Sequence, residues 1–302
     1  MKKNLIIIAG PTAVGKTALS IELAKFYNCP IISADSRQFY KEMSIGTAKP
    51  TKEEMQDVPH YFIDNISIHD TYNVGQFERD AIDCIENLFK EHEQIILVGG
   101  SGLYINAILN GVDEFEEIPS QIREQLIKNF EEKGLIYLQE ELKQLDEVYY
   151  HQVDLNNPQR IMRALEVCIH NNKPYSSFRT KEKKQRPFDT INILINTERE
   201  TLYARINKRF DVMMQNGLLE EVKSLYPYKH LNALNTVGYK ELFDFMDGKY
   251  TLEDAINLIK QNSRRYAKRQ LTWFNHQGDF ETFEPTDIEK IKAYIDIVTK
   301  FS

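Results

Sequence analysis

A phosphate-binding pattern near the start of the chain constrains its fold more than any other feature. Residues 10–17 are Gly-Pro-Thr-Ala-Val-Gly-Lys-Thr and match G-x-x-x-x-G-K-[ST]. The apolar run at 5–9 predicts a buried strand before this loop, and apolar residues at helical spacing over 18–26 predict a helix after it. Strand, glycine loop and helix in this order make a cradle for a polyphosphate or a pyrophosphate.

Each residue type in the loop has a role in holding phosphate. Glycine lets backbone N–H groups turn onto phosphate oxygens, and the helix behind adds the positive end of its dipole. Lys16 is expected to reach the outer phosphate, and the Thr17 hydroxyl to face Mg²⁺, the one cofactor predicted. The pyrophosphate-binding residues predicted are Gly10, Pro11, Thr12, Ala13, Val14, Gly15, Lys16 and Thr17.

Strand and helix patterns alternate along the first part of the chain. Further strands are predicted at 30–33, 61–66, 94–98 and 190–196, with helices at 52–57, capped by Thr51, and at 74–91. This alternation predicts an α/β fold, a P-loop NTPase-like parallel sheet with right-handed crossovers and flanking helices. The chain after the last of these strands is predicted to be helical at 199–216, 218–225, 251–275 and 287–300.

The middle of the chain has a different character. From about residue 112, Glu and Lys dominate, apolar residues recur at helical spacing, and no strand is predicted before 190. Residues 112–188 are therefore predicted to form a helical insertion domain in a core domain made of 1–111 and 189–302. Within it, Asn157 and Pro158 are predicted to cap and open a helix.

Charge and cysteine usage exclude several classes of protein. The net charge of −7 excludes a wholesale basic surface, so a nucleic acid must be bound by local patches. The three cysteines lie far apart without metal-ligand spacing, which indicates neither a zinc site nor a disulfide framework and favours a reducing cytoplasm. No apolar run is long enough for a signal peptide or a membrane span.

An expected acid is missing from the sheet, and another acid lies near the loop. The strand at 94–98 ends in Gly99-Gly100-Ser101, where many kinases and NTPases have an aspartate that holds Mg²⁺. Asp35 instead follows the strand at 30–33, at the sheet edge where open α/β folds place ligands. There Asp35 can be a metal ligand or a general base, or it can cap a following helix.

Seven segments, in order and over nearly the whole chain, resemble bacterial tRNA dimethylallyltransferases. They are residues 10–17, 33–40 (SADSRQFY), 45–50 (IGTAKP), 98–104 (VGGSGLY), 157–160 (NPQR), 237–239 (VGY) and 265–274 (RYAKRQLTWF). The resemblance implies transfer of a dimethylallyl group from dimethylallyl pyrophosphate to N6 of adenosine 37 in tRNA, forming N6-dimethylallyladenosine. Pyrophosphate would be released into the phosphate loop, which then needs no NTP.

The same resemblance implies the catalytic residues Asp35, Ser101, Lys16 and Arg209. Asp35 would take a proton from the adenine amine, a poor nucleophile because its lone pair is delocalised. Lys16, Mg²⁺ and Arg209 would stabilise the charge on the leaving pyrophosphate, unless Arg209 is only a surface arginine. Ser101, where most relatives have threonine, would keep a hydroxyl near Asp35, or would only tighten a glycine turn.

The partner implied by the resemblance is tRNA, held by its anticodon stem-loop. Its adenine would be flipped out of the stack into a channel through the protein, beside Asp35. The residues expected to contact tRNA are Asp35, Ser36, Arg37, Gln38, Ser101, Arg123, Gln159, Arg160, Ile161, Met162 and Arg163.

Two further basic segments have open roles. The helix with Arg264, Arg265, Lys268 and Arg269 is either an RNA-binding surface or a solvated face, with Trp273 and Phe274 expected in the core. The tract from Arg179 to Arg186 has the same two interpretations.

Three other functions are compatible with parts of the pattern. An isopentenyltransferase acting on free AMP or ADP shares the core and the donor, but does not need a domain that holds an RNA stem. A small-molecule P-loop kinase needs a metal-holding acid after a strand such as 94–98. A non-catalytic RNA-binding module leaves Asp35 and the loop without a role. A monomer is the default expectation.

Overall fold

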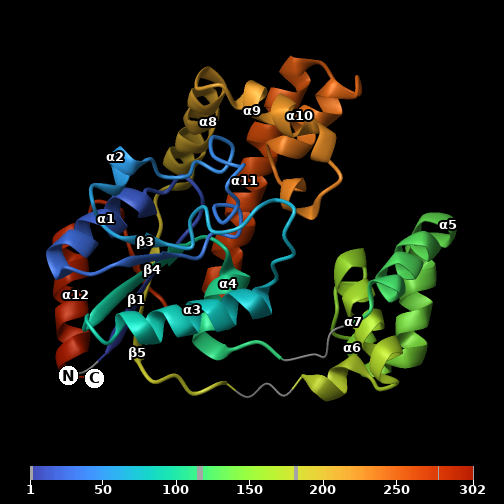
Figure 1. Ribbon diagram of the computed structural model, residues 1–302, viewed down its shortest axis with the longest axis horizontal. Coiled ribbons are helices and arrows are strands. Elements are labelled where there is room, and N and C mark those ends of the chain that lie inside the picture. The colour runs from blue at the N-terminus through green and yellow to red at the C-terminus, as the bar shows by residue number, and fades with distance from the viewer. Residues whose placement is uncertain (1–2, 114–117, 180–182, 278, 302) are drawn as a thin grey trace. The chain divides into compact units, whose positions relative to one another are not determined.

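The computed structural model describes residues 3–113, 118–179, 183–277 and 279–301. Six strands in these ranges form one parallel sheet in the order β3-β2-β4-β1-β5-β6 (Figure 1). They are β1 Asn4–Ala9, β2 Ile31–Ser33, β3 His60–Tyr61, β4 Gln94–Gly99, β5 Asp189–Ile195 and β6 Glu281–Phe283. The predicted α/β fold with a parallel sheet flanked by helices is confirmed.

The central strand β1 explains how helices come to cover both faces of the sheet. It lies between β4 and β5 and is buried along its whole length. Because successive side chains of a strand point to opposite faces, Ile6 and Ile8 enter one core and Leu5 and Ile7 the other. The first core is covered by α1 Lys16–Tyr27, α8 Arg199–Gln215 and α12 Ile288–Phe301, and the second by α3 Val74–Leu88 and α4 Gly102–Asn110.

A third core lies beside the sheet and is built by helices late in the chain. It joins residues 40–68 to the end of α8, to α9 Leu218–Leu225 and α10 Tyr239–Met246, and to α11 Leu252–Gln277. The long helix α11 runs past all three cores, since it contributes Ile259 to the third, Ala267 to the first and Phe274 to the second. It is therefore the common support of the sheet and the late helices (Figure 1).

The chain divides into two compact units, Met1–Asn110 with Lys184–Ser302, and Gly111–Lys183. The second unit consists of α5 Ser120–Leu145, interrupted at Gly134 with φ +77°, α6 Glu147–Tyr150 and α7 Pro158–Asn171, around a core that includes Leu142 and Leu165. The chain leaves the first unit at Asn110 and returns at Lys184, whose N–H donates to the Asn110 carbonyl at 3.0 Å. The two crossing points are thus adjacent.

The end of the basic tract belongs to the sheet unit rather than to the insertion. The Arg186 guanidinium donates to Glu78 Oε1 at 2.7 Å and to the carbonyls of Ala107 and Ile108 at 2.7 and 2.8 Å. Arg186 is therefore neither an RNA-binding nor a solvated side chain. Its side chain is only 11% exposed and connects the returning chain to α3 and α4. Lys181 lies outside the described residues.

Helix caps were predicted correctly, and some of the short elements were not. Thr51 accepts from the N–H of Glu54 at the start of α2 Lys52–Met55, and Asn157 accepts from that of Arg160, both at 3.2 Å. The strand predicted at 61–66 is wrong beyond Tyr61, because Phe62 and Asp64 have φ of +61° and +55°, which a strand does not allow. Strand β6 and helix α10 were missed.

Short 3₁₀ helices complete the described secondary structure, at Tyr175–Phe178, Tyr226–Tyr228 and Asn232–Leu234. Among the described helices, none is both long and apolar enough to cross a bilayer.

Candidate active site

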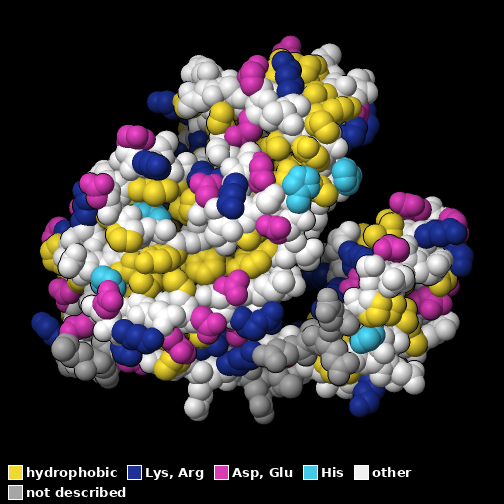
Figure 2. Space-filling model, in the orientation of Figure 1, with side chains coloured by type: hydrophobic (Ala, Val, Ile, Leu, Met, Phe, Trp, Pro, Cys, Tyr) yellow, Lys and Arg dark blue, Asp and Glu magenta, His cyan; other side chains and the backbone are white. Residues whose placement is uncertain are grey.

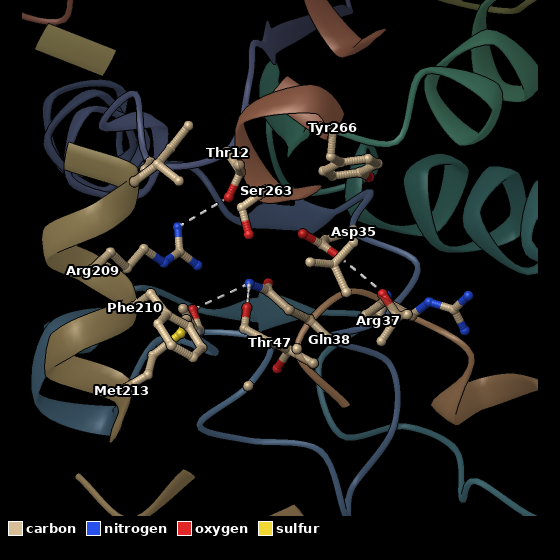
Figure 3. Close-up of a pocket in the computed structure, with 18 of the residues that line it drawn as sticks. Thr12, Asp35, Arg37, Gln38, Thr47, Arg209, Phe210, Met213, Ser263 and Tyr266 are labelled. Carbon is tan, nitrogen blue, oxygen red and sulfur yellow. Dashed lines mark hydrogen bonds between the residues drawn. The ribbon is translucent and has the colours of Figure 1, made fainter. Parts of the chain in front are cut away.

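The phosphate loop lies between β1 and α1 and is supported by two other helices, α8 and α11. Gly15 has φ +111°, a conformation open to glycine, and places the start of α1 behind the loop. Arg205 of α8 donates to the Val14 carbonyl at 3.0 Å, and Arg209, one turn further, lies 3.4 Å from Thr12 Oγ1 (Figure 3). The loop is therefore held in shape without a ligand.

Gln270 joins the phosphate loop to the loop after β4. Its Oε1 accepts from the Thr12 N–H, and its Nε2 donates to the Gly100 carbonyl, each at 2.9 Å. Its side chain is buried, and both ends of its amide are used. Helix α11 thereby fixes the distance between the two loops that border the site.

Two cations lie at the phosphate loop without an acidic partner among the described residues. Burial lowers the pKa of Lys16 to about 7; Asp35 opposes this shift and Arg209 adds to it. Burial also lowers the pKa of Arg209, against the attraction of Asp35 and Glu54. Lys16 Nζ donates to the Pro11 carbonyl at 2.7 Å, which leaves two of its three donor positions open. This end of the site is built for an anion.

Asp35 lies directly after β2 and faces the same cavity. Its Oδ1 accepts from the N–H of Arg37 at 3.0 Å, so that the turn at 36–39 orients the carboxylate (Figure 3). No hydrogen bond from the described chain reaches Oδ2, so that oxygen can accept a proton or a ligand. The alternative of a helix cap is wrong, because the next helix begins only at Lys52.

Ser101 links the end of β4 to the segment after Asp35. Its Oγ accepts from the N–H of Ser36 at 3.2 Å and donates to Ser36 Oγ at 3.3 Å. Its hydroxyl therefore does more than tighten a glycine turn, because it spans two strand ends.

Arg37 and Gln38 use their side chains in different ways. The Arg37 guanidinium donates to the carbonyls of Asn232, Ala233 and Asn235 at 2.9–3.4 Å, so it holds that segment in place. Gln38 points into the cavity, with Nε2 on the carbonyls of Thr47 and Ala48 and Oε1 3.3 Å from the Ser33 hydroxyl (Figure 3). Of the two, only Gln38 presents its functional group to the cavity.

One cavity of about 560 Å³ brings most of these residues together, although Ser101 and Arg205 do not line it. Its lining includes Lys16, Thr17, Asp35, Gln38 and Arg209. Apolar side chains complete the wall beside the cations; they are Ile206, Phe210, Met213, Leu218 and Ile259. Every lining residue comes from the sheet unit. The cavity thus combines an anion site, a carboxylate and an apolar wall.

In the helical unit, most of the predicted RNA-binding side chains already have partners. Arg123 and Arg163 share the Glu166 carboxylate at 2.7 and 3.1 Å, and Arg123 also donates to Gln159 Oε1. Arg160 is exposed and forms no ion pair with a described residue. On the face shown in Figure 2, basic and acidic side chains are interspersed rather than gathered in one basic surface.

The prediction that Ile161 and Met162 contact RNA is wrong for their side chains. They are 0% and 2% exposed and pack in the core of the helical unit. Their positions follow from the amphipathic character of α7, whose apolar face must be buried.

A model of the IPP transferase family matches residues 38–277 of the chain. The tRNA dimethylallyltransferase of Christiangramia forsetii is 54% identical over 284 residues, 94% of each chain. That of Flavobacterium johnsoniae is 52% identical over 300 residues, 97% of each chain. The chain belongs to the IPP transferase family.

Solved structures with family activity in their names share the fold. A tRNA delta(2)-isopentenylpyrophosphate transferase from Staphylococcus epidermidis has a TM-score of 0.71 and 37% identity, covering 98% of this chain and 99% of that one. A eukaryotic dimethylallyltransferase acting on tRNA has a TM-score of 0.79 and 27% identity, covering 99% and 78%. The similarity to both spans nearly all of this IPP transferase family chain.

Three site residues of this family member were missed by the sequence analysis. Arg205 and Gln270 brace the phosphate loop, and only contacts between distant elements reveal them. Tyr266 of α11 lines the cavity and is 38% exposed; burial raises the pKa of its hydroxyl to about 12, and Asp35 acts in the same direction. Tyr266 and Gln270 both lie within the segment of resemblance at 265–274, and Tyr266 is interleaved with basic residues, but neither signal gave them a role.

Proposed function

We propose that this chain transfers a dimethylallyl group from dimethylallyl pyrophosphate to N6 of adenosine 37 in tRNA. The observation that carries the proposal is the single cavity with two half-buried cations, an apolar wall and a carboxylate that keeps one oxygen open. Membership of the family, and the names of relatives about half identical to this chain, support tRNA as the acceptor over free AMP or ADP and over a kinase substrate.

The phosphate loop would hold the pyrophosphate of the donor. Lys16 and Arg209 lie on the side of the loop that faces the cavity, and both are desolvated. Each of these charges stabilises an anion placed there more than it would in water, because little solvent screens the interaction. As the C–O bond breaks, charge grows on the leaving oxygen, so the same groups stabilise the transition state more than the bound donor.

The donor atoms at the loop fit Mg²⁺. The hydroxyl of Thr17 and the carboxylate of Asp35 both line the cavity, and a bound pyrophosphate would add oxygens of its own. Mg²⁺ takes hard oxygen ligands, commonly a carboxylate or a hydroxyl together with substrate phosphates. Among the described residues there is no cluster of three or more His, Cys, Asp or Glu that could hold a metal by itself. The ion would supply further charge stabilisation on the pyrophosphate, with Thr17 as its protein ligand.

Asp35 would serve as the general base. The adenine nitrogen forms a bond to the allylic carbon, the bond from that carbon to the pyrophosphate oxygen breaks, and the amine proton passes to Oδ2. The Arg37 N–H on Oδ1 fixes the carboxylate while leaving that second oxygen available. Ser101 holds the Asp35 segment in register with the end of β4 through its two contacts to Ser36.

The apolar wall suits the hydrocarbon part of the donor. Phe210 and Met213 of α8 lie on the same helix as Arg209 (Figure 3). A donor whose pyrophosphate is held by Arg209 would therefore place its five-carbon tail against apolar side chains. Such a surface also excludes water from a reactive allylic centre.

The helical unit would hold the anticodon stem-loop. Arg160, exposed and without an ion pair in the described chain, and the N-terminus of α7 capped by Asn157, offer contacts to phosphates. A monomer remains the proposed assembly state.

The test is incubation of the protein with dimethylallyl pyrophosphate and Mg²⁺ in the presence of tRNA, AMP or ADP, followed by mass analysis of the nucleosides. We expect N6-dimethylallyladenosine from tRNA alone, at the position 3′ to the anticodon. Modification of free AMP or ADP, or consumption of ATP without prenyl transfer, would contradict the proposal. A tRNA with guanosine at position 37 is the matched control, because it has no N6 amine.

A further inference from the structure

A loop at the edge of the cavity is wrapped around one carboxylate. The N–H groups of Ser44 and Ile45 donate to Glu221 Oε2 at 3.0 and 2.7 Å, and that of Gly46 donates to Oε1 at 3.0 Å. Three consecutive N–H groups converging on one anion form a nest, an arrangement that binds anions strongly. Here the anion is supplied by α9 of the same chain.

Tyr239 completes the shell around this carboxylate. Its hydroxyl donates to Glu221 Oε1 at 2.6 Å, and its side chain is fully buried at the start of α10. Burial, together with the charge of Glu221, raises the pKa of Tyr239, so the hydroxyl remains a donor. Within the described chain no lysine or arginine forms an ion pair with Glu221, which therefore relies on these four hydrogen bonds.

Gly46 shows that the loop and Tyr239 fit closely. A Cβ at residue 46 would lie 2.5 Å from the Tyr239 ring, well inside contact distance. The residue must therefore be glycine for the loop to approach the ring. The hydrogen bonds to Glu221 and the close contact with the Tyr239 ring thus hold the loop in the same position.

The opposite end of the loop reaches the acceptor side of the cavity. The carbonyls of Thr47 and Ala48 accept from Gln38 Nε2 at 3.3 and 3.4 Å. Carbonyls only accept hydrogen bonds, so this pair forces the nitrogen of the amide toward the loop and the oxygen away from it. Oε1, near the Ser33 hydroxyl at 3.3 Å, keeps a lone pair for a donor such as an adenine amine.

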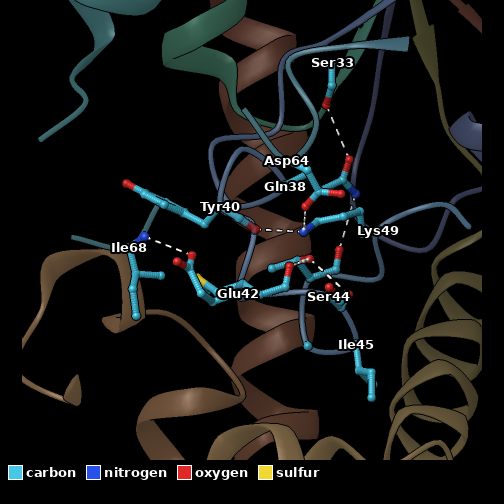
Figure 4. Close-up of polar contacts among 12 residues, drawn as sticks. Ser33, Gln38, Tyr40, Glu42, Ser44, Ile45, Lys49, Asp64 and Ile68 are labelled. Atoms are coloured by element: carbon cyan, nitrogen blue, oxygen red, sulfur yellow. Dashed lines mark hydrogen bonds and ion pairs between the residues drawn. The ribbon is translucent and has the colours of Figure 1, made fainter. Parts of the chain in front are cut away.

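A second tie fixes the far end of the same segment (Figure 4). Lys49 Nζ donates to the Tyr40 carbonyl at 2.7 Å and pairs with Asp64, with only 5% of the lysine side chain exposed. The N–H of Asp64 in turn donates to the backbone carbonyl of Gln38 at 3.2 Å. Segment 44–49 is therefore held at both ends, by Glu221 on one side and by Lys49 on the other.

We propose that Glu221 and Tyr239 act as a clamp that positions the loop at 44–48 and, through it, the Gln38 amide for the acceptor adenine. They are positioning residues, since neither contacts the reacting atoms. This inference rests on the proposed function, because it assigns Gln38 to the adenine. It predicts that α9 and α10, which carry the clamp, control the acceptor end of the cavity and leave the phosphate end unchanged.

The test uses Glu221→Gln and Tyr239→Phe. A glutamine places an NH₂ group against N–H and O–H donors, so at least one hydrogen bond is lost and the loop shifts. Tyr239→Phe removes only one donor and keeps the ring against Gly46, so it remains foldable even if the first variant is not. Glu220→Gln is the matched control, because it makes the same change on the same helix at a side chain that is 70% exposed.

Two readouts separate positioning from general instability. We expect kcat/KM for tRNA to fall about 100-fold in Glu221→Gln, since a misplaced group costs about this much, and about 10-fold in Tyr239→Phe. The Kd for pyrophosphate should stay at the wild-type value in both. A wild-type kcat/KM in both variants, or an equal loss of pyrophosphate affinity, would overturn the inference.

Hydrogen exchange tests the clamp independently of activity. The amides of residues 44–46 should exchange faster in Glu221→Gln than in wild type or in Glu220→Gln, because their acceptor is weakened. Unchanged exchange would refute the clamp. Absence of prenyl transfer by the wild-type protein would instead refute the proposed function, so the two failures are distinguishable.

Discussion

The chain has two sets of cations that we propose contact phosphate groups, and it holds them in opposite ways. Lys16 and Arg209 lie half-buried at the phosphate loop with no ion pair among the described residues, and desolvation lowers the pKa of both. In the helical unit, Arg123 and Arg163 are paired with Glu166, itself only 6% exposed. The first set lacks an anion that a substrate would supply, whereas the second already has one from the protein.

We therefore expect different roles for the cations at the phosphate loop and for those of the helical unit. Partly desolvated cations without an ion pair are costly to keep and interact strongly with any anion that enters, so they suit a leaving group whose charge changes during reaction. Arginines that share a carboxylate fix the geometry of their helix. Their charge is already partly neutralised, so binding a phosphate stabilises them less. We therefore expect changes in the cavity to alter the rate, and changes in the helical unit to alter RNA binding or stability.

Asp35→Asn should give the largest effect on rate. The asparagine keeps an acceptor for the Arg37 N–H but does not take up a proton, so single-turnover transfer should slow by about 10²–10⁴-fold, the usual value of a general base. Affinity for tRNA, measured by filter binding, should stay close to wild type. An unchanged rate would remove Asp35 from the proton transfer.

Arg209→Met should come next. It keeps much of the length of the side chain but removes a charge from the leaving-group site, and kcat should fall by about 10²–10³-fold, as for loss of one oxyanion donor. Lys208→Met, at the exposed neighbouring position on α8, is the control and should behave as wild type. If both variants lost activity equally, a specific role for Arg209 would be refuted.

The pKa of Lys16 makes donor binding depend on pH. Free Lys16, with a pKa of about 7, is charged below that pH, and a bound pyrophosphate favours the charged form and raises the pKa. Binding therefore takes up a proton, and affinity is highest below pH 7. It falls by up to about tenfold per pH unit above 7, until the pH passes the raised pKa of the complex.

The ratio of wild-type to Lys16→Met affinity isolates this effect, because titration of pyrophosphate itself is common to both proteins. Calorimetry in buffers of different ionisation enthalpy would count the proton directly. A ratio that stays constant between pH 6 and pH 9 would contradict the expected depression of the Lys16 pKa.

The smallest effects belong to the helical unit, where Arg160 and Arg123 should differ. Arg160→Ala should weaken tRNA binding and lower the slope of log Kd against log salt by about 1, as for one lost phosphate contact. Arg123→Ala should mainly destabilise the unit, by about 1–3 kcal/mol, because it takes a partner from the buried Glu166. Thermal unfolding and tRNA binding, both measured on each variant, separate the two effects. Loss of stability in Arg160→Ala and loss of binding in Arg123→Ala would contradict this expectation.

Local signals in the sequence were sufficient for much of this structure. The loop at 10–17, the position of Asp35 after β2 and the caps at Thr51 and Asn157 depend on neighbouring residues only, and each is found as predicted. Trp273 and Phe274 pack against the sheet, as their apolar character indicated. These features need no knowledge of distant contacts.

Other features depend on residues far apart in the chain. Strand β6 has three residues and forms only because β5 offers an open edge. Gln270 and Glu221 look like ordinary polar residues on helices until the loops they hold, 170 or more residues away, are placed beside them. Ile161 and Met162 were assigned to RNA because they directly follow the segment of resemblance at 157–160, although helical periodicity alone puts them inside.

The hydrogen bond from the Lys184 N–H to the Asn110 carbonyl bears on how the helical unit can be gained or lost. Because the helical unit leaves and re-enters the sheet unit at neighbouring residues, one insertion or deletion event is enough to add or remove it without breaking a strand. A truncated chain with a short turn between 110 and 184 should therefore still fold, and would keep the phosphate loop, Asp35 and the cavity.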